Sequence, residues 1–165
     1  MVGKAFRQLA EAYQAQQNWV GCLASYQESI NWDLKVGKLQ GVIISQLHIF
    51  ELLVQLGQFE KAIELAMSQL PNSDDREKSE LSKIIGESYF NLSQYNEAIP
   101  YLKAYKGKQG KWNNTDYYQL GYAYYKQNDF ESAISEFNKI IDGRNAVAQN
   151  AYYHLGESYV KIKKM

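Results

Sequence analysis

The chain has 165 residues, 45% of them hydrophobic and 22% charged, which is typical of a folded globular protein rather than a disordered one. Its 18 Lys and Arg residues balance 18 Asp and Glu residues, so a broad positive field for nucleic acid or an anionic membrane is excluded. The single cysteine, Cys22, excludes an intramolecular disulfide and a multi-cysteine zinc site, and is compatible with a reducing compartment.

No run of about eighteen apolar residues is present, so we expect no transmembrane helix. The first residues place Lys4, Arg7 and Glu11 on helical spacing and contain no apolar core of signal-peptide type. We therefore expect a cytoplasmic protein.

The spacing of apolar residues predicts an all-α chain of about nine helices. In chain order, the expected helices span 4–17, 19–33, 38–55, 59–70, 75–91, 95–106, 115–127, 130–141 and 146–163. Pro71 should end the fourth helix, and Ser73 or Asp74 should cap the fifth. Asn113 or Asn114 should cap the seventh in the same way.

Comparison of the chain with itself reveals a repeat at an offset of thirty-five residues. Gly86, Gly121 and Gly156 each follow Ile or Leu, and a tyrosine stands three residues after each glycine. A small residue at this position allows two helices of a hairpin to approach closely, while large residues fill the holes between neighbouring hairpins.

This pattern resembles the tetratricopeptide repeat, a helix-turn-helix unit of about thirty-four residues. The resemblance implies a right-handed α-solenoid of stacked antiparallel hairpins that forms a single domain over 1–165. The implied repeats lie near 3–36, 43–76, 79–112 and 114–147, followed by a terminal single helix at 148–165.

In this family the first helix of each hairpin lines a concave groove, which the resemblance carries to particular residues here. On the fourth copy these are Tyr118, Tyr122 and Tyr125, flanked by Lys126; their spacing puts the three rings on one helix face. The corresponding residues elsewhere are Lys83, Glu87, Phe90 and Asn91 on the third copy, Tyr153 and Glu157 on the fifth, and Lys4, Arg7, Glu11 and Gln14 on the first.

Tyrosine suits a peptide groove because it offers a large contact area with little rotamer entropy to lose. For the Tyr118, Tyr122 and Tyr125 set we favour binding over simple coverage of the core, and regard these rings as dispensable for the fold. By contrast, the four tyrosines that match the family's packing positions are expected to serve the fold: Tyr117, Tyr124, Tyr152 and Tyr159.

The residues that could support catalysis form no recognisable constellation, so we expect neither enzymatic activity nor a cofactor. His48 and His154 have no second ligand at metal-binding spacing and are expected to be ordinary helix residues. A group of lysines in and before the loop 107–112 is expected to form a solvated rim that could meet an acidic partner: Lys103, Lys106, Lys108 and Lys111.

Two functional hypotheses follow. The first is a non-enzymatic scaffold or adaptor that binds a peptide segment of a partner protein, with the acidic column of Glu87 and Glu157 favouring a basic ligand. The second is a designed, chimeric or truncated repeat module that has no ligand of its own, or that self-associates as a homo-oligomer through its C-terminal helix. Twelve of the 14 tyrosines lie at position 89 or later, which suits either a binding surface in the second half or two joined ancestries.

Overall fold

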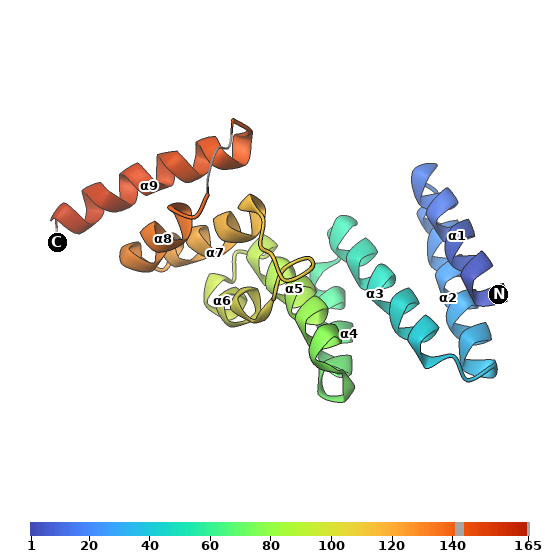
Figure 1. Cartoon of the computed structure of the whole chain (residues 1–165). Coiled ribbons are helices and arrows are strands. Elements are labelled where there is room, and N and C mark those ends of the chain that lie inside the picture. Colours follow the sequence, from blue (N-terminus) through green and yellow to red (C-terminus); the bar gives the residue numbers. More distant parts are fainter. Residues whose placement is uncertain (141–143, 165) are drawn as a thin grey trace. The chain divides into compact units, whose positions relative to one another are not determined.

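A computed structural model describes residues 1–140 and 144–164. Over these residues the regular structure consists of nine α-helices, one short 3-10 helix and an isolated bridge, which confirms the predicted all-α class. The chain divides into two compact units, Met1–Gln58 and Phe59–Met165, which are described separately below (Figure 1). The expectation of one continuous domain over 1–165 stays a prediction.

The first unit contains α1 (Val2–Ala15), α2 (Trp19–Lys35) and α3 (Leu39–Gln55). A short turn joins α1 to α2, and these two helices lie side by side (Figure 1). A core cluster of this unit joins Ala10 of α1 and Cys22 and Tyr26 of α2 with Leu52 of α3, all of them buried. Cys22 therefore occupies the place of a small apolar residue, and its burial raises the pKa of its thiol.

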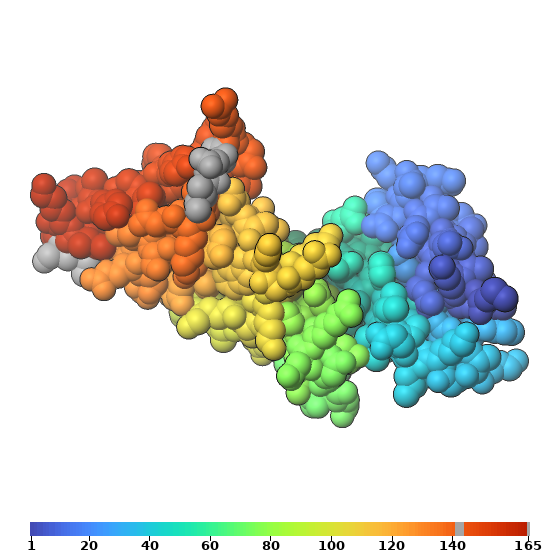
Figure 2. Space-filling model, in the orientation of Figure 1, coloured from blue at the N-terminus to red at the C-terminus, as the bar shows by residue number. Residues whose placement is uncertain are grey.

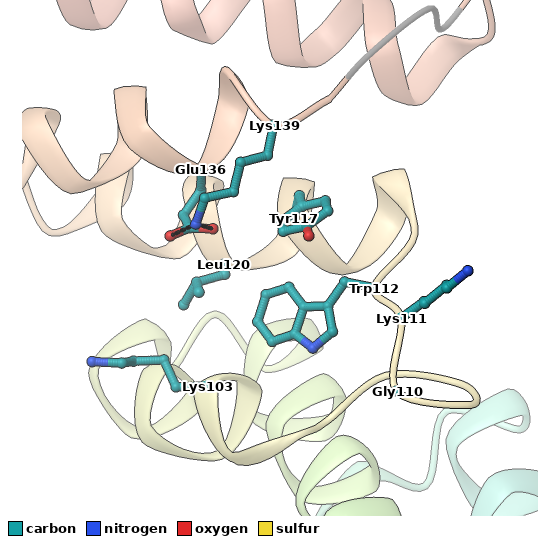
Figure 3. Close-up of a pocket in the computed structure, with 8 residues that line it drawn as sticks. All are labelled: Lys103, Gly110, Lys111, Trp112, Tyr117, Leu120, Glu136 and Lys139. Atoms are coloured by element: carbon teal, nitrogen blue, oxygen red, sulfur yellow. Dashed lines mark hydrogen bonds and ion pairs between the residues drawn. The ribbon is translucent and has the colours of Figure 1, made fainter.

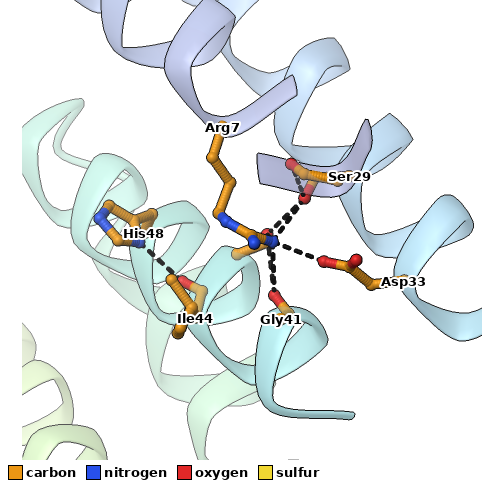
Figure 4. A network of polar contacts seen from close by, with 8 residues as sticks. Arg7, Ser29, Asp33, Gly41, Ile44 and His48 are labelled. Atoms are coloured by element: carbon orange, nitrogen blue, oxygen red, sulfur yellow. Dashed lines mark hydrogen bonds and ion pairs between the residues drawn. The ribbon is translucent and has the colours of Figure 1, made fainter. Parts of the chain in front are cut away.

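A buried ion pair connects the three helices of the first unit (Figure 4). Arg7 of α1 donates to Asp33 of α2, and also to the Ser29 hydroxyl at 2.8 Å and the Gly41 carbonyl at 3.1 Å. Only 3% of the Asp33 side chain is exposed, against 17% for Arg7. Arg7 thus belongs to a structural network, in contrast to the groove position expected for it, because its guanidinium reaches across α2 to α3.

The second unit contains α4 (Phe59–Gln69), a 3-10 helix η1 (Leu70–Asn72), α5 (Asp75–Asn91), α6 (Tyr95–Ala104), α7 (Asn114–Lys126), α8 (Phe130–Phe137) and α9 (Ala146–Lys164). Each α-helix packs on the next, and α7 packs in addition on α5 and α9. The core of this unit includes two clusters of buried residues: Ala98, Leu102, Leu120 and Ala123 in one, and Ala133, Phe137, Ile140, Ala148 and Ala151 in the other.

Two reciprocal caps set where α5 and α7 begin. Asp74 accepts a hydrogen bond from the Glu77 amide at 2.8 Å, and the Glu77 carboxylate accepts one from the Asp74 amide at 3.1 Å. Asn113 and Asp116 form the equivalent box on α7. The structure therefore selects Asp74 and Asn113 from the two alternatives predicted for each helix. At the other end of the unit, α8 ends at Phe137, before the predicted boundary at 141, which lies outside the described residues.

The glycines of the repeat allow close helix contacts. A Cβ atom at Gly86 would lie 2.9 Å from Cδ2 of Leu102, and one at Gly121 would lie 2.8 Å from Cδ1 of Phe137. Leu102 and Phe137 occupy the same position on the helix that follows each glycine. Gly156 repeats the pattern, yet no described atom would lie within 4 Å of a Cβ there.

Candidate binding face on α5, α7 and α9

Aromatic side chains from α5 and α7 form a continuous row in the second unit. The ring centroids of Phe90 and Tyr122 lie 5.8 Å apart, those of Tyr118 and Tyr122 5.7 Å, and those of Tyr122 and Tyr125 6.1 Å. These distances are typical of interacting aromatic pairs. The contact between Phe90 of α5 and Tyr122 of α7 joins the two helices in this row.

The helix α9 completes this surface through His154. Its ring centroid lies 4.9 Å from those of Tyr122 and Tyr125 and 5.1 Å from that of Tyr153. The His154 side chain is 17% exposed and packs among these rings, a contact that the sequence did not predict. His154 lies three residues after Ala151 and four before Ser158, so all three share one face of α9. Ala151 and Ser158 are both fully buried, and this spacing is the feature of the sequence that could have indicated an inward-facing His154.

Glu157 is the polar residue that contacts three side chains of the same surface. Its carboxylate accepts hydrogen bonds from the Tyr125 hydroxyl at 2.9 Å and the Tyr153 hydroxyl at 3.1 Å, and lies 3.1 Å from Nδ1 of His154. The hydrogen bond from Tyr125 is the largest influence that lowers the pKa of Glu157. Burial first, and then the bond to Glu157, raise the pKa of Tyr125 to about 12. The carboxylate is therefore ionised at neutral pH and fixed in orientation.

We call the surface formed by Phe90, Tyr118, Tyr122, Tyr125, Tyr153, His154 and Glu157 the aromatic face. At its edges Lys126 lies 5.8 Å from the Tyr122 ring centroid, and Lys83 lies 4.0 Å from a Glu87 oxygen. The Asn91 side-chain amide donates to the Glu87 carbonyl at 2.7 Å. Tyr153 is 63% exposed, and Lys126 and Asn91 are also exposed, so these three offer the accessible groups of the surface.

The structure corrects the prediction of which tyrosines support the fold and which are exposed. Tyr118, Tyr122 and Tyr125 are half-buried and pack against the core cluster that contains Phe137, so the fold uses them. In contrast, Tyr152 and Tyr159 were assigned to packing positions but are 49% and 53% exposed. The reason is that a packing position on a first helix is filled by the second helix of the same hairpin, and no described helix follows α9.

In the space-filling view, the atoms of α7, α8 and α9 form one continuous block within the second unit (Figure 2).

Among the described residues, no group of three or more His, Cys, Asp or Glu side chains is arranged to hold a metal ion. No helix in the described part of the chain has the length and apolar character needed to cross a bilayer.

Comparison with known proteins agrees with this architecture. Residues 117–142 match the family model of the tetratricopeptide repeat. A crystal structure of the MamA protein matches with a TM-score of 0.74 and 18% identity, covering 98% of this chain and 83% of that chain. A MamA mutant structure matches with a TM-score of 0.68 and 15% identity, covering 98% and 88%. No curated protein sequence matches the chain.

At these identities the likeness to MamA concerns the fold. Residues 117–142 therefore match one tetratricopeptide repeat, and the chain as a whole shares the fold of these solved structures. This fold is generally a scaffold for protein interactions.

Proposed function

We propose that the chain is a non-enzymatic scaffold that binds a peptide segment of a partner protein along α5, α7 and α9. The observation that carries this proposal is the aromatic face, where rings from neighbouring first helices surround a fixed, ionised carboxylate. Rigid rings suit peptide recognition because little rotamer entropy remains to be lost on binding. We further infer a cytoplasmic location, which the free Cys22 suits.

The chemistry of the aromatic face favours a basic ligand. Glu157 presents a carboxylate beside aromatic rings, and a Lys or Arg side chain can interact with both kinds of group. Glu87 is a second carboxylate, on α5, and Lys83 lies 4.0 Å from one of its oxygens. A partner segment with one or two basic residues next to an apolar residue is therefore the proposed ligand class.

Tyr153 provides the cleanest test, because the tyrosines of α7 also support the core. Basic peptides selected from a displayed library against the intact protein should bind the Tyr153→Ala variant about 5- to 30-fold more weakly, as expected for loss of a contacting ring worth roughly 1–2 kcal/mol. The matched control is Tyr152→Ala, which removes a similarly exposed ring from another face of α9. Equal affinity for the two variants would show that peptides do not use the aromatic face.

The alternative function, a repeat module that self-associates through its C-terminal helix, is supported by a separate observation. Tyr152, Tyr159 and Val160 of α9 are exposed, and Gly156 between them is open. Exposed apolar side chains gathered on one helix are typical of association surfaces. Sedimentation at increasing protein concentration tests this hypothesis. Self-association through α9 would be excluded if the wild-type protein and the Tyr159→Ala variant both remain monomers at every concentration.

A further inference from the structure

A concave site lies in the second unit and is lined by side chains that are not part of the aromatic face. It has a volume of about 600 Å³ and is formed by α6, the loop before α7, α7 itself and α8 (Figure 3). Its lining residues are Lys103, Gly110, Lys111, Trp112, Tyr117, Leu120, Glu136 and Lys139. We call it the lysine pocket.

The loop of the lysine pocket is held in one conformation by its own contacts. The Trp112 indole donates to the Tyr105 carbonyl at 2.7 Å, and the Lys106 amide donates to the Ser79 hydroxyl at 2.9 Å. Gly107 has a φ of 83°, and a Cβ there would lie 2.4 Å from backbone atoms of Lys111, so the tight turn requires glycine. A fixed loop means that little ordering entropy is lost when a ligand binds.

The wall and floor of the pocket are apolar and aromatic. The rings of Trp112 and Tyr117 lie 5.3 Å apart at an angle of 50°, and Leu120 below them is 3% exposed. Both rings are half-buried, so each still presents part of its surface to the pocket. Such a wall favours a ligand that brings a ring or a large aliphatic side chain.

The rim of the pocket carries an excess of positive charge. Lys139 donates to both oxygens of Glu136 at 2.8 Å, which neutralises the one carboxylate among the described lining residues. Lys103 and Lys111 remain, and both are exposed. In Figure 3 these two lysines lie at opposite ends of the pocket with Trp112 between them. Two cations on either side of an aromatic ring suit an extended chain that carries carboxylates on both sides of an apolar side chain.

We propose that the lysine pocket binds an acidic peptide segment of a partner protein, in which Asp or Glu residues flank an aromatic or large aliphatic side chain. The central side chain lies against Trp112 and Tyr117, and the flanking carboxylates pair with Lys103 and Lys111. This site is independent of the aromatic face and takes a ligand of the opposite charge.

Fluorescence anisotropy with a labelled Gly-Asp-Glu-Phe-Glu-Asp-Gly peptide tests the proposal. Lys103→Ala and Lys111→Ala should each weaken binding about two- to five-fold, as expected for single exposed ion pairs, and the double variant should weaken it about tenfold. Lys108→Ala is the matched control, because Lys108 is exposed in the same loop but does not line the pocket. Replacing the peptide's Phe by Ala should also weaken binding about tenfold.

Three results would overturn the proposal. The first is equal binding of the uncharged peptide Gly-Asn-Gln-Phe-Gln-Asn-Gly, and the second is an equal loss of affinity in Lys108→Ala and Lys111→Ala, which would indicate unspecific attraction. The third is complete displacement of the peptide by an equimolar amount of phenylacetate, which would assign the pocket to a small aromatic acid. Unchanged binding by Tyr153→Ala is expected and separates this site from the aromatic face.

Discussion

The guanidinium of Arg7 is surrounded by acceptors from α2 and α3 (Figure 4). Ser45 donates to the Ser29 hydroxyl at 3.0 Å, and Ser29 donates to the Gly3 carbonyl at 2.9 Å, so the polar atoms around the ion pair are also hydrogen-bonded. Cβ atoms at Gly3 and Gly41 would lie 2.2 Å and 2.1 Å from Asp33 oxygens. The two glycines therefore let three helices close around a buried carboxylate, which is costly to leave without a partner.

Removal of the Arg7 charge should accordingly destabilise the first unit. Arg7→Met keeps much of the side-chain volume but leaves the Asp33 carboxylate buried without its cation, and we expect a loss of about 3 kcal/mol. Urea unfolding followed by circular dichroism measures this loss. Lys4→Met is the control, since Lys4 is exposed on the same helix. Similar stability of the two variants would mean that the Asp33 carboxylate does not depend on Arg7.

Glu157 should give the second unit an acid-sensitive contribution to stability. Because the folded state lowers the pKa of Glu157, its contacts stabilise the fold above the ordinary pKa of 4.5, and this stabilisation is lost as the pH falls through the folded pKa. Glu157→Gln should therefore be less stable than the wild type at neutral pH, and the difference should shrink at about pH 3. Chemical unfolding at both pH values tests this, with the exposed Glu64→Gln as control. A difference independent of pH would rule out a role for the ionised carboxylate.

At the scale of the helices, the next helix along the chain determines whether a side chain packs against the repeated glycine. Gly121 lies under Phe137, whereas Gly156 lies under no described side chain. The same residue type in the same sequence pattern thus serves close packing in one hairpin and has no packing partner in α9. This difference also accounts for the exposure of Tyr152 and Tyr159, which stand on either side of Gly156 along the helix.

Alanine substitution at these two glycines should have opposite effects. Gly121→Ala forces a Cβ against the Phe137 ring, and the overpacking cost should exceed the gain in helix propensity and destabilise the unit by about 1–2 kcal/mol. Gly156→Ala meets open space and should stabilise α9 by up to about 1 kcal/mol. Thermal unfolding of both variants decides the question, and a shift in the same direction for both would contradict this packing argument.

At the scale of the whole molecule, each of the two units contains at least one core cluster of its own. The clusters around Phe137 and Leu102 belong entirely to the second unit, and the cluster around Tyr26 belongs to the first. A unit with its own core can fold by itself. We therefore expect residues 59–165, expressed alone, to keep their helical signal and a cooperative thermal transition. A non-cooperative transition would show that this unit needs residues 1–58.

Much of this fold could be predicted from the sequence, because helix type and boundaries depend on local rules. The apolar spacing predicted every α-helix, and Asp74 and Asn113 were among the cap residues expected from turn chemistry. The offset of thirty-five residues identified the repeat, because stacking places the same demand on each hairpin. The proposed binding residues on α5, α7 and α9 likewise came from that regularity, and their role in binding stays a prediction.

Tertiary structure decided which side chains meet across helices. Neither the pairing of Arg7 with Asp33 nor the place of His154 beside Tyr122 and Tyr125 could be predicted from the sequence, since these contacts join residues far apart in the chain. From their positions in the repeat, the sequence analysis assigned Tyr118 to binding and Tyr152 to packing. The burial of each ring depends instead on whether another helix covers it. Local propensity and periodicity therefore determined the helices and their order, and only packing determined which tyrosines support the core and which remain available to a partner.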